Sequence, residues 1–267
     1  MTKQNYGASY FNGCPIAFPD FIEMCHGLGM SFIEIQMEPP FSPPEIDTRL
    51  KETVIDCLGT YNLTPTIHGP YDDINLSSFK ERIRRSSLDI MKDCIDFADD
   101  IGSTIIVVHG GSCSIHQISR YEDAVQRFRA SLLELAMYAH DRGIQIGVEN
   151  KQLGRDRELV LYPDEHFEVV QEYSDFDVRA VVDVGHAHTA DIAIVEYLEK
   201  MNPYLIEVHL HDNDGSSDAH VSLGKGTADI KGAIGALHRM DFTGPVIFEL
   251  DTQTELEEAL SFIATHS

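Results

Sequence analysis

The sequence predicts an α/β protein that forms one (β/α)8 barrel over residues 1–267. Three observations support this fold. Short apolar runs alternate with amphipathic segments along the whole chain. The apolar runs are unbroken stretches of Val and Ile, as in parallel strands that are buried on both faces. No linker rich in Ser, Gly or Pro divides the chain, so a single domain is expected.

Most of the expected strands are short runs rich in Val, Ile and Phe. The expected strands cover residues 6–10 (YGASY, without these residue types), 32–36, 65–69, 104–109, 144–149, 178–184, 204–210 and 245–250. Apolar residues three and four positions apart fill the intervals, which is the periodicity of a helix with one buried face. They predict helices over 17–28, 45–61, 79–101, 119–142, 163–173, 190–200, 229–240 and 254–265.

The helix over 119–142 has the clearest pattern. Ser119 is a suitable N-cap, and Gly143 is suited to end the helix. The residues that repeat at helical spacing are Val125, Phe128, Leu132, Leu135, Ala136 and Ala139. This stripe indicates packing against the strands.

Six consecutive apolar runs end in a residue that can bind a metal ion. The runs PTIH, IIVVH, IQIGVE, VRAVVD, LIEVH and PVIFE end in His68, His109, Glu149, Asp183, His209 and Glu249. In a parallel barrel the C-terminal ends of the strands share one rim, and the active sites of this fold lie there. We therefore expect these side chains to converge on one site.

Two local motifs add further candidates. In VVDVGHAH, His186 follows Asp183 by three residues on the turn that leaves a strand. In HLHDNDGSSDAHVSLGKG, Asp218 and His220 are two apart, and residues at this spacing on an extended loop point the same way. Both motifs fit donors to the same cluster.

The nine candidates combine five imidazoles with four carboxylates and contain no thiolate. Such a set suits Zn²⁺, Mn²⁺ or Fe²⁺. Buried Asp and Glu are rare unless they are paired or bound to a metal, which argues against separate core roles for all of them. Four carboxylates around one divalent ion leave a charge of about −2, and around three ions about +2. The full set favours two or three ions, and the range from one to three stays open.

Five motifs resemble those of the xylose isomerase-like TIM-barrel superfamily, which includes sugar phosphate isomerases, epimerases and endonuclease IV. They are HGPYDDINLSS, IIVVHGGS, GVENK, VVDVGHAH and HLHDNDGSSDAHVSLGKG, and the resemblance extends from about residue 30 to the end. It implies that His186 contacts substrate, as in the epimerases. Residues that fall where the epimerases hold their single catalytic metal are Glu149, Asp183, His209 and Glu249.

The endonuclease IV pattern is matched by more residues. The resemblance implies a first metal at His68 and His109, with Glu149 as the bridging carboxylate. It places Asp183, His209 and Glu249 at a second metal and His186, Asp218 and His220 at a third. However, the N-terminal YGASYFNGCP lacks the His/Ser-rich first strand of that enzyme. No basic loop with apolar wedges for a DNA minor groove is evident either.

The formal net charge is −24, from 44 acidic and 20 basic residues. This charge repels phosphate backbones and acidic membranes. It argues against a nucleic-acid partner, which belongs only to the alternative, endonuclease-like function. A high-salt habitat would explain the same acidity, because salt screens self-repulsion. No signal pattern and no apolar stretch of about 20 residues are found, so we expect a cytoplasmic protein without a membrane partner.

Two functions are therefore expected. The first is a metal-dependent isomerase or epimerase of a small sugar or sugar phosphate, in which Glu149 and Glu249 exchange a proton and His186 polarises an oxygen. Candidate substrate contacts are Lys151, Arg155 and Lys225. The alternative is a trinuclear phosphoester hydrolase acting on abasic DNA or a small phosphodiester. A metal-stabilised scaffold is disfavoured, because structural metal sites do not need an open rim. The substrate, the metal and the subunit number stay open.

Overall fold

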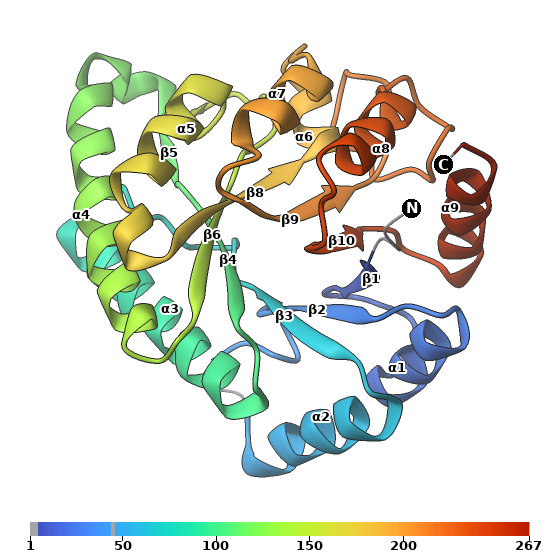
Figure 1. Cartoon of the computed structure of the whole chain (residues 1–267). Helices are drawn as coiled ribbons and strands as arrows, with labels where there is room; N and C mark the ends of the chain where they lie inside the picture. Colours follow the sequence, from blue (N-terminus) through green and yellow to red (C-terminus); the bar gives the residue numbers. More distant parts are fainter. Residues whose placement is uncertain (1–4, 44–45, 267) are drawn as a thin grey trace.

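The computed structural model describes residues 5–43 and 46–266, and these form a closed parallel barrel surrounded by helices (Figure 1). The barrel strands are β1 (Asn5–Tyr10), β2 (Phe32–Gln36), β3 (Thr64–His68), β4 (Ile105–His109), β6 (Gln145–Glu149), β8 (Val178–Asp183), β9 (Leu205–Leu210) and β10 (Pro245–Phe248). Each strand pairs with the next in this order, and β10 closes the ring onto β1. The predicted (β/α)8 fold is confirmed.

The helices lie outside the barrel and cover its strands (Figure 1). They are α1 (Phe18–Gly27), α2 (Thr48–Tyr61), α3 (Glu81–Ile101), α4 (Tyr121–His140), α5 (Pro163–Glu172), α6 (Val184–Thr189), α7 (Ile194–Met201), α8 (Ile230–Arg239) and α9 (Gln253–His266). The apolar stripe predicted on α4 is buried at Phe128, Leu132 and Leu135. Burial of such stripes against the strands supplies the main favourable free energy of the fold.

Several local expectations differ from the structure. Ser119 does not cap α4, because it lies inside a 3-10 helix, Ile115–Arg120, that precedes α4. The expected helix over 45–61 begins at Thr48, where Asp47 accepts a hydrogen bond from the Leu50 amide at 2.8 Å; residue 45 lies outside the described part of the chain. Three short elements were not expected: α6, the 3-10 helix Ser174–Phe176, and an antiparallel sheet of β5 (Ser112–Cys113) and β7 (Arg157–Glu158).

The barrel interior is not uniformly apolar. Strand β2 carries the fully buried Glu34 between Ile33 and Ile35, and β9 carries the fully buried Glu207. Charged side chains are almost never fully buried unless they have partners. The two glutamates therefore form a polar layer inside the barrel, where partners for their carboxyl groups are expected.

The histidine at 166 joins α5 to the strand that carries Glu149. The Nε2–H of His166 donates to the Val148 carbonyl at 2.8 Å, and Nδ1 accepts from the Tyr197 hydroxyl at 2.6 Å. Burial lowers the pKa of His166 to about 4. The neutral ring is thus the form that the fold accommodates.

We expect this histidine to make the protein sensitive to acid. Its folded pKa lies below the unfolded value of about 6.5, so the unfolded state binds more protons as the pH falls, and stability is lost between about pH 6.5 and pH 4. At pH 4.5 the loss is about 2 to 3 kcal/mol. Urea unfolding of wild type and His166→Gln at pH 7 and pH 4.5 measures this difference. An equal pH dependence in the two proteins would contradict the assignment.

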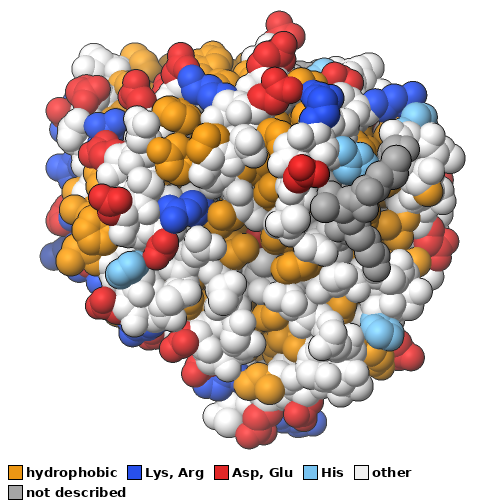
Figure 2. Space-filling view, viewed as in Figure 1, with side chains coloured by type: hydrophobic (Ala, Val, Ile, Leu, Met, Phe, Trp, Pro, Cys, Tyr) orange, Lys and Arg blue, Asp and Glu red, His pale blue; other side chains and the backbone are white. Residues whose placement is uncertain are grey.

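The surface agrees with the acidic composition. On the face shown in Figure 2, acidic side chains are spread widely and basic side chains are interspersed among them. Within the described residues, no helix is long and apolar enough to cross a membrane.

Candidate metal centre

The register of the barrel brings the predicted strand-end residues together. His109 is the register partner of Glu149, and Asp183 is the register partner of His209, at the C-terminal ends of adjacent strands. Glu149, Asp183 and His209 are fully buried. All nine candidates gather at this end of the barrel, in overlapping groups of three or four donors.

Glu149 lies at the centre of the cluster. Its Oε2 is 2.6 Å from Nε2 of His109 and 3.2 Å from Nε2 of His68. Its Oε1 is 3.2 Å from Nδ1 of His186 and 3.3 Å from Nδ1 of His209. Each oxygen of this carboxylate thus faces a different pair of imidazoles.

Three histidines are oriented by backbone carbonyls. The Nδ1–H groups of His68, His186 and His220 donate to the carbonyls of Gly69, Asn150 and Glu249, at 2.7, 2.9 and 3.1 Å. In a neutral ring this leaves the Nε2 lone pair free. Each Nε2 faces a carboxylate oxygen of Glu149 or Asp218 at 3.1–3.2 Å. Such a carbonyl contact is how metal-binding histidines are usually held.

A nitrogen lone pair and a carboxylate oxygen repel each other at this distance unless a positive charge lies between them. A tetrahedral ion with ligand distances near 2.1 Å separates its ligands by about 3.4 Å, which is close to the separations observed here. Within the described residues, several buried polar atoms of the cluster also lack a hydrogen-bond partner: Glu149 Oε1, Asp183 Oδ2, His209 Nδ1, both ring nitrogens of His211, and Asp218 Oδ1. The residues present thus fit a divalent cation.

A second donor group lies beside Glu149 and consists of His186, His211, Asp218 and His220. Nε2 of His211 is 3.2 Å from Asp183 and 3.4 Å from Asp218. The His211 ring also stacks on the His220 ring at 3.8 Å. A Cβ on Gly185 would lie 2.0 Å from the His211 ring, so glycine is required at that position.

The loop that carries Asp218 and His220 is held by a single carboxylate. The Asp212 side chain accepts hydrogen bonds from the amides of Asn213, Gly224, Gly226 and Ala228, at 2.9–3.0 Å. Asp212 and Val221 also exchange backbone hydrogen bonds. The SLGKG segment thus fixes the return of the loop toward the rim.

Asn150 positions Asp183 and His186 together. Its side-chain amide donates to the Asp183 carbonyl and accepts from the Asp183 amide, at 3.0 and 2.9 Å. Its own carbonyl accepts from His186. Asp183 then caps α6 by accepting from the His186 amide. This explains why the VVDVGHAH motif forms a short helix here.

His209 is held from below by the buried carboxylates of Glu34 and Glu207, each 3.2 Å from its Nε2. Its Nδ1 points to Glu149 and Glu249 at 3.3 and 3.5 Å. Although burial opposes it, the Glu34 and Glu249 carboxylates raise the pKa of His209 well above its usual value. Nδ1 is therefore the nitrogen available to a metal.

The two buried carboxylates should respond differently to mutation. Burial raises the pKa of Glu207 to about 7, so a glutamine there resembles the protonated acid present at pH 6. We expect Glu207→Gln to cost less than about 1 kcal/mol and Glu34→Gln, which removes an anion beside His209, about 3 kcal/mol. Urea unfolding of the metal-free proteins at pH 6 measures both. Equal losses would contradict this difference.

When no metal is bound, protonated histidines supply the positive charge beside the carboxylates. Although burial opposes it, Asp183 raises the pKa of His186 well above its usual value, and Asp218 raises that of His220 to about 9. Although burial opposes this too, His109 and His209 hold the pKa of Glu149 well below the usual value. Because metal ligands must be deprotonated, an ion bound by these residues would displace protons and would bind more weakly as the pH falls.

Comparison with known proteins assigns the chain to a family. The model of the family described as "Xylose isomerase-like TIM barrel" matches residues 22–266. The chain belongs to this family.

The proteins that this chain resembles are named for different activities or for none. An uncharacterised protein of Methanocaldococcus jannaschii is 29% identical over 191 residues, which cover 71% of this chain and 65% of that protein. A probable endonuclease 4 of Mycobacterium leprae is 26% identical over 189 residues, which cover 68% of this chain and 71% of that protein. The crystal structure of a D-tagatose 3-epimerase-like protein superposes with a TM-score of 0.89 at 23% identity, covering 98% of this chain and 97% of that chain.

The three predicted substrate contacts differ in their placement. Lys151 lines a cavity of about 200 Å³ directly at the cluster. Arg155 is exposed and does not line this cavity. Lys225 does not line this cavity either, and its Nζ forms an ion pair with Glu258 at 3.1 Å.

Sequence reasoning missed two residues that lie in the donor groups of this chain. Glu207 precedes His209 by two residues on β9, and His211 follows it by two residues, directly after the strand ends; all three are fully buried. Alternate residues of a strand point to one face. The LIEVHLH alternation was therefore the available signal for both.

Proposed function

We propose that this protein is a divalent-metal-dependent isomerase or epimerase of a small polyhydroxylated substrate, a sugar or sugar phosphate. The observation that carries the proposal is the cavity of about 200 Å³ above the cluster, which reaches Glu149, Glu249 and His186. Ligand pockets for drug-sized molecules usually measure about 300–1,000 Å³. A smaller space with mostly polar walls suits a compact hydrophilic molecule.

The metal would be held by Glu149, Asp183, His209 and Glu249. When bound, it would supply Lewis-acid polarisation of substrate oxygens. The remaining chemistry belongs to the side chains. One carboxylate of the pair Glu149 and Glu249 removes a proton from the carbon beside the substrate carbonyl, and the other returns a proton to the opposite face. In its protonated form, His186 donates a hydrogen bond from Nε2–H to the substrate oxygen on which charge develops.

Deuterium exchange tests this reaction directly. We expect the Mn²⁺-loaded protein to incorporate solvent deuterium at one carbon of a ketopentose or ketohexose, as measured by NMR in D₂O. Glu249→Gln should abolish the exchange, whereas Glu257→Gln on α9 should not. Absence of exchange across a panel of ketoses and their phosphates would contradict the proposal.

A second candidate is phosphoester hydrolysis with three metal ions. The donor group of His186, His211, Asp218 and His220 supports it, because an enzyme with a single metal does not need this group. In that reaction Glu149 would bridge two ions. Incision of a duplex oligonucleotide with one abasic site, measured beside an undamaged duplex, distinguishes the candidates. Robust incision without ketose exchange would replace the first proposal with the second.

A further inference from the structure

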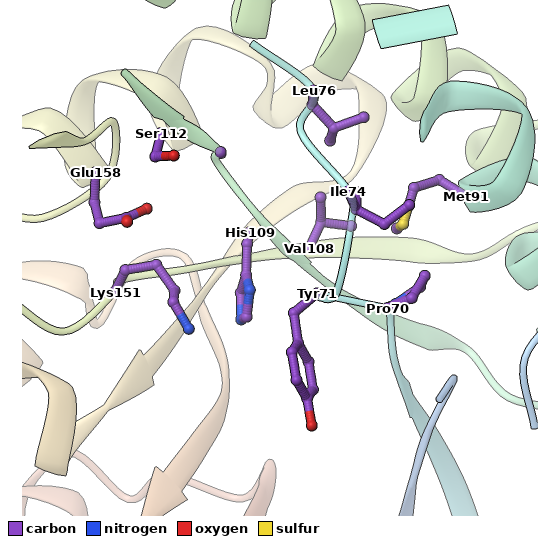
Figure 3. A pocket seen from close by; sticks show the side chains of 11 residues that line it. Pro70, Tyr71, Ile74, Leu76, Met91, Val108, His109, Ser112, Lys151 and Glu158 are labelled. Atoms are coloured by element: carbon purple, nitrogen blue, oxygen red, sulfur yellow. The ribbon is translucent and has the colours of Figure 1, made fainter. Parts of the chain in front are cut away.

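A second cavity of about 190 Å³ opens beside the metal centre (Figure 3). It shares Tyr71, His109 and Lys151 with the cavity at the cluster. The two cavities therefore adjoin at these side chains.

One wall of the second cavity is apolar. Leu76, Met91 and Val108 are buried, and Ile74 lies partly exposed at its edge. In Figure 3, Ile74, Leu76 and Met91 lie on one side of His109. This wall can cover C–H groups and offers them no hydrogen bond.

The opposite wall is charged. Lys151 and Glu158 lie together on the other side of His109 (Figure 3). Within residues 5–43 and 46–266, Lys151 forms no ion pair shorter than 4 Å. Glu158 is partly buried, and burial raises its pKa to about 7 although Lys151 opposes the shift.

The two walls restrict the chemistry of an occupant. A phosphate could accept from Lys151, but it would also meet the Glu158 carboxyl and an apolar surface that cannot bind its oxygens. A purely apolar group would leave Lys151 and Glu158 without partners, at a cost of about 1–3 kcal/mol for each unsatisfied group. A polyol ring satisfies both walls, because its C–H face covers the apolar side while its hydroxyls accept from Lys151 and donate to Glu158.

We propose that the natural substrate is glycosylated: the metal centre binds the reacting sugar, and the second cavity binds a further sugar ring linked to it. This inference rests on the proposed function for the first ring only. Each cavity, at about 200 and 190 Å³, holds one compact ring. Recognition of the second ring would make the protein selective for a two-unit sugar over a free monosaccharide.

Binding of methyl α-D-glucopyranoside to the EDTA-treated protein tests the second cavity without the reaction. We expect saturation-transfer NMR signals from the glucoside ring in wild type. Ile74→Trp, which fills the edge of the cavity, should reduce them at least fivefold, and Glu158→Gln about threefold. Ile55→Trp, on the exposed face of α2, is the matched control and should leave them unchanged. No transfer in wild type, or equal transfer in Ile74→Trp, would overturn the proposal.

Turnover separates this inference from the proposed function. With Mn²⁺ bound, we expect kcat/KM for isomaltulose, a glucosylated fructose, to exceed that for D-fructose at least tenfold. Ile74→Trp should bring the ratio toward one. Equal kcat/KM values in wild type would overturn the proposal. Glucoside binding in the absence of any ketose turnover would support the second cavity and contradict the epimerase assignment.

Discussion

Glu149→Gln should reduce kcat/KM for a sugar that shows deuterium exchange by at least about 10³-fold, because it removes the side chain that we propose both as a metal ligand and as a proton-transfer group. The change keeps the size of the side chain but replaces one oxygen by an amide nitrogen. That nitrogen would face ring nitrogens of histidines that now face Glu149 oxygens at 2.6–3.3 Å. Steady-state kinetics at saturating metal measure the first effect, and a competition titration measures the metal affinity.

The matched control is Glu168→Gln on α5, whose side chain is largely exposed and 3.9 Å from Arg129. It should leave both quantities unchanged. If Glu149→Gln kept its metal affinity and lost less than about tenfold in kcat/KM, Glu149 would have neither role.

Metal removal should destabilise the protein strongly. The cluster holds Glu149, Asp183, Asp218 and Glu249 within a few ångströms, above the buried Glu34 and Glu207. Ligand binding at about 1,000 times Kd stabilises a folded protein by about 4 kcal/mol. For a domain of this size we expect the Tm to fall by about 10 °C in EDTA.

Differential scanning calorimetry with EDTA and with added Mn²⁺ or Zn²⁺ measures this shift. His220→Gln keeps most of the cluster and should retain part of the stabilisation. Mg²⁺, which dehydrates reluctantly and prefers oxygen ligands, is a further comparison and should restore less. Identical Tm values with and without metal would contradict a resident ion.

The barrel could be predicted because burial on both faces gives its strands a recognisable composition. Runs such as IIVVH at 105–109 are buried on both faces, and buried parallel strands contain little else than Val and Ile. The predicted and observed strand ends differ by one or two residues. The strand expected over 245–250, for example, ends at Phe248. Glu249 therefore lies just beyond its strand, at the rim.

The short elements could not be predicted from periodicity. Strands β5 and β7 have two residues each, which is too few for an alternating pattern. Helix α6 has six residues and depends on Asp183, which caps it. Ser119 was a reasonable cap by residue type, but the preceding 3-10 turn places it inside a helical segment.

The nine candidate donors were predictable as a set because one rim collects the ends of parallel strands. The polar layer below them was not. Glu34 and Glu207 come from strands on different parts of the ring, and only the closed barrel brings both to His209. Lys151 lines the cavity at the cluster and Arg155 does not, and residues 151–156 have no regular secondary structure whose periodicity could have separated the two.

The most direct test of the central claim is the metal content of the protein. Wild type and Glu149→Gln are dialysed to equilibrium against Zn²⁺ or Mn²⁺, and bound ions are counted by elemental analysis. We predict at least one ion per chain in wild type and a clearly lower number in the variant. One ion would support the epimerase, and three would support the hydrolase. No bound ion in wild type, or the same number in both proteins, would contradict a metal centre built around Glu149.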